Sequence, residues 1–293
     1  MRPDHPRRTR VINLLLMAVV AAAVLDGCAS VPKRNPLPVE FYETASIPGI
    51  EYARYFADDA PPFENAWLAQ SREELESRFP AAFGTPHHYL AISGGGPKGA
   101  FGAGLLAGWS AKGDRPEFQV VTGISTGALT APWAFLGSDY DYVLEEMYTS
   151  YSTRDLLKQR SKLSVVSNDA VTSTEGLQAL LARYIDEDVL EAIAAEGRRG
   201  RSLIIATTNL DAQRPVLWRI HTIAMSGQLG ALDLIRQIIL ASASIPAIFP
   251  PVAIEVEADG QRFDELHVDG GVTSQVVLYP PNLDWSRILN RLE

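Results

Sequence analysis

Short apolar runs alternate with glycine-containing turns and helix-like stretches in the middle of this sequence. Residues 89–92 (Tyr-Leu-Ala-Ile) and 118–121 (Phe-Gln-Val-Val) have the length and composition of buried strands. Each is followed by a glycine-containing turn and a stretch that predicts a helix. This alternation predicts a parallel sheet covered by helices, in which sites form in the loops at the carboxyl ends of the strands. The loops at residues 94–99 and 123–127 are therefore the candidate positions for a site.

The N-terminal pattern is of another kind. Four arginines within the first ten residues precede an apolar stretch of 15 residues, 11–25. A positively charged N-terminal region, a short apolar segment and a small residue before the cleavage site are typical of a secretory signal peptide. The apolar stretch is also short for a membrane-spanning helix, which needs about 20 residues. We therefore expect residues 1–27 to be a signal peptide.

The single cysteine of the chain follows directly, in Leu25-Asp26-Gly27-Cys28. This resembles a bacterial lipobox, whose cysteine is lipidated and becomes the first residue of the mature protein. Asp26 departs from the small uncharged residue usual there, so an ordinary cleaved signal or an uncleaved anchor is the alternative. The resemblance predicts a lipoprotein-type signal, membrane anchoring through Cys28, and a location in the bacterial cell envelope on the periplasmic or extracytoplasmic side.

The next segment is rich in proline, with six prolines between residues 32 and 62. The segment has no clear periodicity and predicts an extended tether over residues 28–62, although its aromatic residues indicate that part of it packs onto the following domain. Residues 63–79 then predict an amphipathic helix. We expect the folded domain to comprise residues 63–293.

Composition and charge narrow the function classes. Hydrophobic residues make up 46% of the 293 residues and charged residues 21%, which is typical of a folded chain with a sizeable core. The formal net charge of −9 argues against nucleic-acid binding, which usually requires a basic surface. One cysteine excludes an intramolecular disulfide framework and a cysteine-clustered zinc site.

Residues 123–127 (Gly-Ile-Ser-Thr-Gly) have the form of a nucleophile elbow. The flanking glycines permit a cramped strand-to-helix turn that presents the Ser125 hydroxyl above the sheet, at a helix N-terminus. Five residues with three fixed positions are a weak match by themselves. The predicted strand before them and the predicted helix after them strengthen it.

The glycine loop at residues 94–99 (Gly-Gly-Gly-Pro-Lys-Gly) has several interpretations. It fits a dinucleotide-binding fingerprint, but that fold needs an acidic residue at the end of the second strand, where this chain has Val121-Thr122-Gly123. An oxyanion hole is the better interpretation, because successive glycine amides at a helix N-terminus can stabilise a developing negative oxygen. A plain tight turn, with Lys98 as a solvated surface lysine, is the alternative. The candidate oxyanion-hole residues are Gly94, Gly95, Gly96, Lys98 and Gly99.

A nucleophilic serine needs a base. His267 and Asp269 lie two residues apart in a predicted strand, so both side chains can face one pocket. The following Asp-Gly-Gly could also be a plain turn. The other histidines are assigned to the signal peptide, the surface or a structural role: His5, His87, His88 and His221.

Together these motifs are similar to those of the patatin-like phospholipase family. Gly-Gly-Gly-x-Lys-Gly at 94–99, Gly-x-Ser-x-Gly at 123–127 and Asp-Gly-Gly at 269–271 occur in the order and context of that family. Residues 203–211 and 241–251 also resemble family segments. The resemblance implies an α/β fold, three-layer α/β/α and patatin-like, with a mainly parallel central sheet.

The same resemblance implies a Ser–Asp dyad, with Ser125 as nucleophile and Asp269 as base. The amides around Gly95 and Gly96 would stabilise the oxyanion, and water would hydrolyse an acyl-enzyme, so that neither metal nor cofactor is needed. A carboxylate can serve as the base if burial raises its proton affinity. The implied activity is that of a phospholipase A or lysophospholipase, acting on a membrane lipid or lysolipid.

Two other functions stay open. An α/β-hydrolase would use a Ser-Asp-His triad, which Asp211 or Asp233 followed by His267 satisfies in order. Against it, the glycine loop lies only about thirty residues before Ser125, which leaves room for one strand–helix unit where that fold has several. A non-catalytic lipid-binding lipoprotein is the second alternative, weakened by the intact serine, aspartate and glycine loop.

Two further expectations concern the second half of the chain. Helices between residues 139 and 196 are expected to cap the site, where apolar residues either line an acyl groove or form an ordinary buried helix face. The chain ends 22 residues after Gly271, earlier than family members usually end, which predicts a truncated C-terminus, a fragment or a compact variant. The candidate groove residues are Leu144, Met147, Leu156, Leu157 and Leu163.

Overall fold

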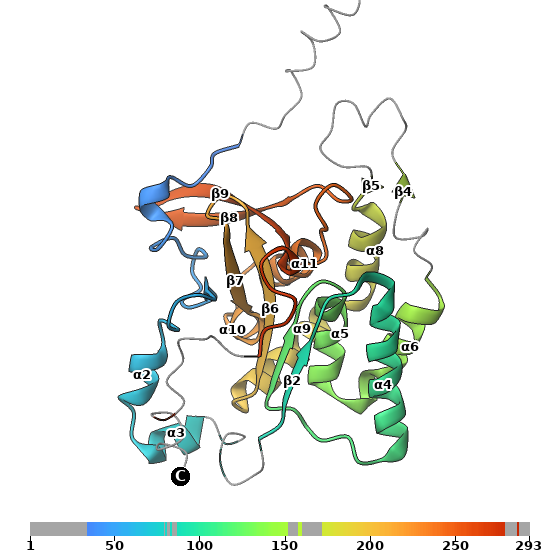
Figure 1. Ribbon diagram of the computed structural model, residues 1–293. Helices are drawn as coiled ribbons and strands as arrows, with labels where there is room; N and C mark the ends of the chain where they lie inside the picture. The colour runs from blue at the N-terminus through green and yellow to red at the C-terminus, as the bar shows by residue number, and fades with distance from the viewer. Residues whose placement is uncertain are drawn as a thin grey trace, which may run out of the picture. The chain divides into compact units, whose positions relative to one another are not determined.

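The computed structural model describes residues 34–78, 80, 83, 87–151, 158–159, 172–278 and 286 (Figure 1). Several expectations lie outside these residues: the signal peptide, Cys28, and the groove candidates Leu156, Leu157 and Leu163. Chain contacts group Pro36–Glu293 into one unit. No helix in the described ranges combines the length and the apolar character needed to cross a membrane.

A seven-stranded sheet forms the centre of this unit in the part of the chain that is described. Its strands run in the order β1-β7-β6-β3-β2, and β9 pairs with both β6 and β8. The strands are β1 (Arg54–Phe56), β2 (Tyr89–Ile92), β3 (Val120–Gly123), β6 (Ser202–Asn209), β7 (Arg214–Arg219), β8 (Val252–Ala258) and β9 (Gln261–Asp269). A separate two-stranded sheet pairs β4 (Lys158–Gln159) with β5 (Thr172–Ser173).

The α/β class predicted from the sequence is confirmed, but the sheet is mixed. Among the strands of the described ranges, β2, β3 and β6 alone run parallel to one another. The pairings of β7 with β1 and β6, and of β9 with β6 and β8, are antiparallel. The sheet expected to be mainly parallel is thus antiparallel in part. β7 follows β6 and β9 follows β8 through short turns, which pair each strand antiparallel with the one before it. Helices α10 and α11 lie between β7 and β8.

Most helices pack on one face of the sheet and bury the main hydrophobic cluster (Figure 1). Leu203 and Ile205 of β6 face this cluster. Leu144 and Met147 are buried in it too, so for these two the buried-face interpretation holds. The helices are α4 (Gly99–Lys112), α5 (Thr126–Leu136), α6 (Asp141–Thr149), α8 (Glu175–Tyr184), α9 (Glu187–Arg198), α10 (Ile220–Met225) and α11 (Ala231–Ser242).

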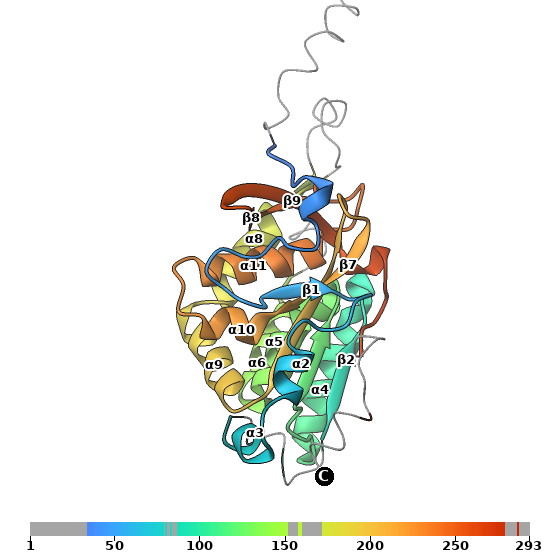
Figure 2. The ribbon, with the colours of Figure 1, turned by 90° about the vertical axis from the view of Figure 1, so that its left-hand side faces the viewer.

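The opposite face of the sheet carries a smaller cluster. Because side chains alternate along a strand, Ile204 and Ala206 of β6 point away from the helices. They pack with Tyr55, Phe63 and Val277. Figures 1 and 2 place the short helix α2 (Glu64–Leu68) on the side of the molecule away from α4 and α6. This second layer comes from the N-terminal segment and from the chain that follows β9.

The segment from Pro36 onward is part of the fold, so the expected tether over residues 28–62 does not hold for it. β1 extends the sheet by pairing with β7, and Ser46 bridges to Glu257 of β8. The apolar residues of this segment explain the difference, because burying Leu37, Ile47, Ile50 and Phe56 stabilises the packed state. The domain therefore begins well before Phe63.

The helix predicted over residues 63–79 is divided in two. α2 ends at Leu68, and α3 (Arg72–Arg78) begins after Ser71. Ser71 and Glu74 form a capping box, in which the Glu74 amide donates to Ser71 Oγ at 3.2 Å and the Ser71 amide donates to Glu74 Oε2 at 2.7 Å. This capping box starts a new helix within a continuous amphipathic pattern.

Candidate active site

Two strands end against the same edge of β6. β3 runs parallel to β6 and ends at Gly123, which pairs with Ile205. β9 runs antiparallel to β6 and ends at Asp269, which pairs with Thr207. The carboxyl ends of β3 and β9 therefore approach each other from opposite directions, and the chain continuing from Gly123 places Ser125 beside this junction.

Ser125 occupies a strained turn between β3 and α5. Its φ of 56° and ψ of −125° are unusual for a residue with a side chain, and it is 6% exposed. A Cβ at Gly123 would lie 2.5 Å from the Gly127 carbonyl oxygen, and a Cβ at Gly127 would overlap the Ile92 carbonyl oxygen. Both glycines of the motif are thus required, because backbone atoms pack where a side chain would lie. The predicted nucleophile elbow has the backbone geometry that such a turn needs.

Asp269 is the last residue of β9 and is 4% exposed. Its carboxylate accepts a hydrogen bond from the Gly271 amide at 2.7 Å. Burial raises the pKa of Asp269 above its ordinary value, while interactions with the Ser125 side chain and the Gly271 amide oppose this shift. The strand pairing thus brings the Asp269 carboxylate to the side of β6 where Ser125 lies, and burial gives this carboxylate the increased proton affinity that a base requires.

The glycine loop lies directly against the elbow. A Cβ at Gly94 would be 2.9 Å from Ser125 Cβ, and a Cβ at Gly99 would overlap Thr126 Oγ1. These two glycines allow close packing. The Gly94 amide donates to the Gln275 carbonyl at 3.4 Å. Gly94 is therefore a packing residue rather than a free donor.

Gly95 and Gly96 differ from Gly94 in having positive φ values of 157° and 53°. Within the described residues, no backbone carbonyl accepts from either amide. These two amides are therefore available to a ligand oxygen. Lys98 closes the short turn η4 (Gly96–Lys98), and its side chain is exposed.

His267 lies two residues before Asp269 but belongs to a different network. Its ring is fully buried, with Nδ1 bonded to Thr207 Oγ1 at 2.9 Å and Nε2 to Glu265 Oε2 at 3.2 Å. Glu265 in turn pairs with Arg54 at 2.8 Å. Burial lowers the pKa of His267, and Glu265 opposes that shift. Both ring nitrogens are thus engaged away from Ser125.

The carboxylates that satisfied the order of a triad are engaged elsewhere as well. Asp211 Oδ2 accepts from the Leu266 amide at 2.9 Å, and Asp233 pairs with Arg236 at 3.3 Å within α11. The sequence order allowed a Ser-Asp-His triad because order contains no information about side-chain partners. These contacts do not assemble such a triad.

One residue in contact with the site was not identified from the sequence. Ser242 is the last residue of α11 and is fully buried. Its Oγ accepts a hydrogen bond from the Ser125 amide at 3.0 Å and donates one to the Ala206 carbonyl at 2.7 Å. The only signal in the sequence was its place in the segment 241–251, which pointed to a family resemblance without assigning a role.

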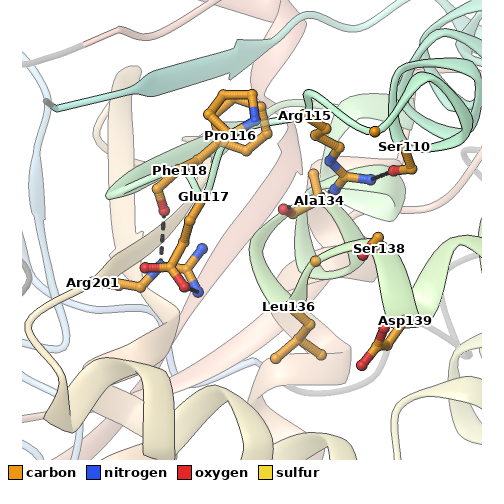
Figure 3. Close-up of a pocket in the computed structure, with 12 residues that line it drawn as sticks. Ser110, Arg115, Pro116, Glu117, Phe118, Ala134, Leu136, Ser138, Asp139 and Arg201 are labelled. Atoms are coloured by element: carbon orange, nitrogen blue, oxygen red, sulfur yellow. Dashed lines mark hydrogen bonds and ion pairs between the residues drawn. The ribbon is translucent and has the colours of Figure 1, made fainter.

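A cavity of about 310 Å³ lies elsewhere, at the amino ends of β3 and β6 (Figure 3). Its two buried cations are already bonded. Arg201 donates to the Phe118 carbonyl at 2.9 Å and pairs with Glu196, and Arg115 pairs with Asp141. Because this cavity lies at the amino end of β3 and Ser125 follows the carboxyl end of that strand, the two are separate. Nowhere in the described ranges do three His, Cys, Asp or Glu side chains gather as a metal site would require.

Comparisons with known proteins identify the family of this chain. The model of the family described as patatin-like phospholipase matches residues 90–280. Curated proteins give no significant match. Among solved structures, the crystal structure of VipD from Legionella pneumophila resembles the chain with a TM-score of 0.45 and 15% identity over 70% of this chain. The likeness covers 49% of VipD, about half of that protein's length. Because the family match extends over well over half of the sequence, the chain belongs to the patatin-like phospholipase family.

Proposed function

We propose that this protein is a lipid acyl hydrolase that cleaves carboxylic esters with a Ser125–Asp269 dyad. The observation that carries the proposal is the meeting of a serine in a strained elbow with a buried carboxylate, at the point where β3 and β9 end against β6. Membership of the patatin-like phospholipase family supports hydrolase chemistry in general terms.

In the proposed reaction, Ser125 Oγ attacks the ester carbonyl carbon while its proton passes to the Asp269 carboxylate. The amides of Gly95 and Gly96 stabilise the oxyanion. The proton then passes from Asp269 to the departing alcohol, which leaves an acyl group on Ser125. A water molecule then hydrolyses the acyl-enzyme. Asp269 takes a proton from the water while the water oxygen attacks the acyl carbon. Asp269 returns the proton to Ser125 Oγ as the free acid leaves.

The raised pKa of Asp269 supports its assignment as the base. A carboxyl group with an ordinary pKa near 4 is a weak proton acceptor toward serine. Burial raises the proton affinity of Asp269, and its acceptance of the Gly271 amide fixes the orientation of the carboxylate. His267 is not needed, since both of its nitrogens have other partners.

Exposed apolar side chains close to the site motifs in the chain support a substrate with acyl chains. Phe101 follows the glycine loop by two residues and is 78% exposed, and Val272 follows Asp269 by three residues and is 54% exposed. Leu105, one turn after Phe101, is also exposed. Exposed apolar side chains on the segments that directly follow the glycine loop and Asp269 favour a lipid ester over a small polar one. The proposed substrate class is a phospholipid or lysophospholipid.

Labelling of the purified protein with a fluorophosphonate tests the nucleophile and the base. Labelling should be lost in Ser125→Ala and strongly reduced in Asp269→Asn, while both variants keep the circular dichroism spectrum of the wild type. Hydrolysis of phosphatidylcholine and lysophosphatidylcholine, measured as released fatty acid, should follow the same order. A folded wild-type protein without labelling or fatty-acid release would contradict the proposal and favour a lipid-binding protein.

A further inference from the structure

We propose that Ser242 is a positioning residue that holds the Ser125 elbow in register with Asp269. This inference rests on the function proposed above and assigns a role to a residue outside the dyad and the glycine loop. The motif Ala-Ser-Ala-Ser at residues 241–244 provides two fully buried serines, of which only Ser242 contacts the elbow.

The Ser125 amide is a donor that the helix cannot satisfy. It lies at the N-terminal end of α5, where the first amides have no acceptor within the helix. In a buried turn, an amide without an acceptor is costly and makes the strained conformation less favourable. The hydroxyl of Ser242 provides the acceptor, at 3.0 Å.

The same hydroxyl also reaches the strand junction. Ala206 lies between Ile205, which pairs with Gly123 of β3, and Thr207, which pairs with Asp269 of β9. Its carbonyl accepts from Ser242 Oγ at 2.7 Å. One side chain thus connects the elbow to β6 at the place where the two strands that carry the dyad end.

The backbone of the same segment holds Asp269. The Asp269 amide donates to the Ser244 carbonyl at 2.9 Å. The segment from Ser242 to Ser244 therefore bonds both members of the dyad, one through a side chain and the other through the main chain. Losing the Ser242 hydroxyl would release the elbow and leave the Asp269 contact in place, which changes the distance between the two reacting groups.

Ser244 offers a matched control. It is equally buried, but its Oγ donates to the Leu240 carbonyl at 2.8 Å, within its own helix turn. Ser242→Ala and Ser244→Ala therefore each remove one buried hydroxyl from the same motif. Only Ser242→Ala removes a contact with the elbow.

The experiment compares both variants with the wild type by kinetics on a soluble short-chain p-nitrophenyl ester and by the NMR shift of the Ser125 amide proton. We expect Ser242→Ala to lower kcat about 10- to 100-fold, as displacement of a reacting group does, with little change in KM. The Ser125 amide proton should move upfield as its hydrogen bond is lost. Ser244→Ala keeps the main-chain carbonyl that holds Asp269, so it should leave the Ser125 shift near that of the wild type and lower kcat far less than Ser242→Ala does.

The two readouts distinguish failure of the positioning role from failure of the proposed reaction. A folded Ser242→Ala with an unchanged Ser125 amide shift, or a loss of kcat equal to that of Ser244→Ala, would overturn the positioning role. An inactive wild type would overturn the proposed reaction, and the amide shift would still report whether Ser242 holds the elbow. If Ser242→Ala does not fold, Ser242→Cys retains a weak acceptor and should show partial loss of kcat with a smaller upfield shift. Wild-type values in Ser242→Cys would count against the role.

Discussion

Gly123 and Asp269 pair with positions of β6 only two residues apart, Ile205 and Thr207. Because β3 is parallel to β6 and β9 is antiparallel to it, the two strands end facing each other along one edge. A fully parallel sheet would bring the carboxyl ends of neighbouring strands together side by side instead. The antiparallel return of β9 is therefore what places Asp269 against the elbow that follows Gly123.

Gly94 should be intolerant of any side chain. A methyl group at this position would lie 2.9 Å from Ser125 Cβ, so the elbow or the loop must move. We expect Gly94→Ala to lower kcat/KM at least about tenfold, because a small displacement at a reacting group has a large effect on rate. Ester hydrolysis by the purified variant measures this effect.

Gly104 is the control for that substitution. It lies within α4, and a Cβ there would meet nothing within 4 Å. Gly104→Ala should therefore keep full activity and raise the free energy of unfolding by about 0.5–1 kcal/mol, since glycine is unfavourable within a helix. Equal activities for the two alanine variants would show that Gly94 does not constrain the elbow.

Activity should fall at acid pH as Asp269 is protonated. The base acts only as a carboxylate, and burial raises the pKa of Asp269 above its ordinary value. Between the ordinary and the raised pKa, a free aspartate is ionised while Asp269 is protonated, so kcat/KM should decline at a higher pH than for an exposed aspartate. A pH profile of kcat/KM, with stability checked at each pH, tests this prediction.

Asp269→Asn should stabilise the protein at neutral pH while it removes activity. With its pKa raised in the folded state, wild-type Asp269 binds a proton more tightly when folded than when unfolded. The free energy of unfolding therefore falls as pH rises from the unfolded pKa through the raised folded pKa, and it stays lower above that window. Asparagine cannot ionise, so the variant avoids this loss. A gain of about 1 kcal/mol would raise the melting temperature by about 2–4 °C.

The same linkage predicts where the stabilisation disappears. Well below the ordinary aspartate pKa of about 4, Asp269 is protonated in both states of the wild type, so the two melting temperatures should converge. Thermal unfolding at several pH values, followed by circular dichroism, measures the difference. A variant less stable than the wild type at neutral pH would show that the hydrogen bond from Gly271 outweighs the cost of burying the charge.

The motifs were readable from the sequence because each depends on local geometry. The two glycines of the elbow are needed for close approach, and Gly96 adopts a positive φ, so these positions restrict residue type strongly. The strand–helix order around residues 89–136 was likewise visible, as short apolar runs separated by glycine-containing turns. β2, α4 and α5 lie where the pattern predicted them, and β3 begins two residues later than the predicted strand at 118–121.

Long-range pairings were not readable in the same way. The sheet's antiparallel half depends on which strand β9 meets, and a strand's own sequence does not encode its partner. Ser242 was missed for a similar reason, because a buried serine near a helix end usually bonds its own turn, as Ser244 does. The prolines of the N-terminal segment predicted an extended tether, whereas this segment packs against β7 and β8.

Membrane association is predicted to depend on Cys28, which lies outside the described residues. If Cys28 is lipidated, its acyl chains hold the protein at a bilayer, at about 0.8 kcal/mol for each buried methylene. In fractionated bacterial cells, the wild type should therefore sediment with membranes and Cys28→Ala should not. Retention of Cys28→Ala in the membrane fraction would assign anchoring to the apolar segment at residues 11–25.

His267→Gln should separate stability from chemistry. The His267 ring packs against Trp218, with ring centroids 5.2 Å apart, and bonds both Glu265 and Thr207. Glutamine keeps hydrogen-bonding capacity but loses the ring contact, so the free energy of unfolding should fall by about 1–3 kcal/mol, as is usual for damage to a buried network. Because no bond joins the ring to Ser125 or Asp269 among the described contacts, fluorophosphonate labelling should persist at a temperature where the variant is folded. Ser125→Ala is the complementary control, folded and unlabelled. Loss of labelling in a folded His267→Gln would instead favour a histidine-dependent mechanism and count against the dyad.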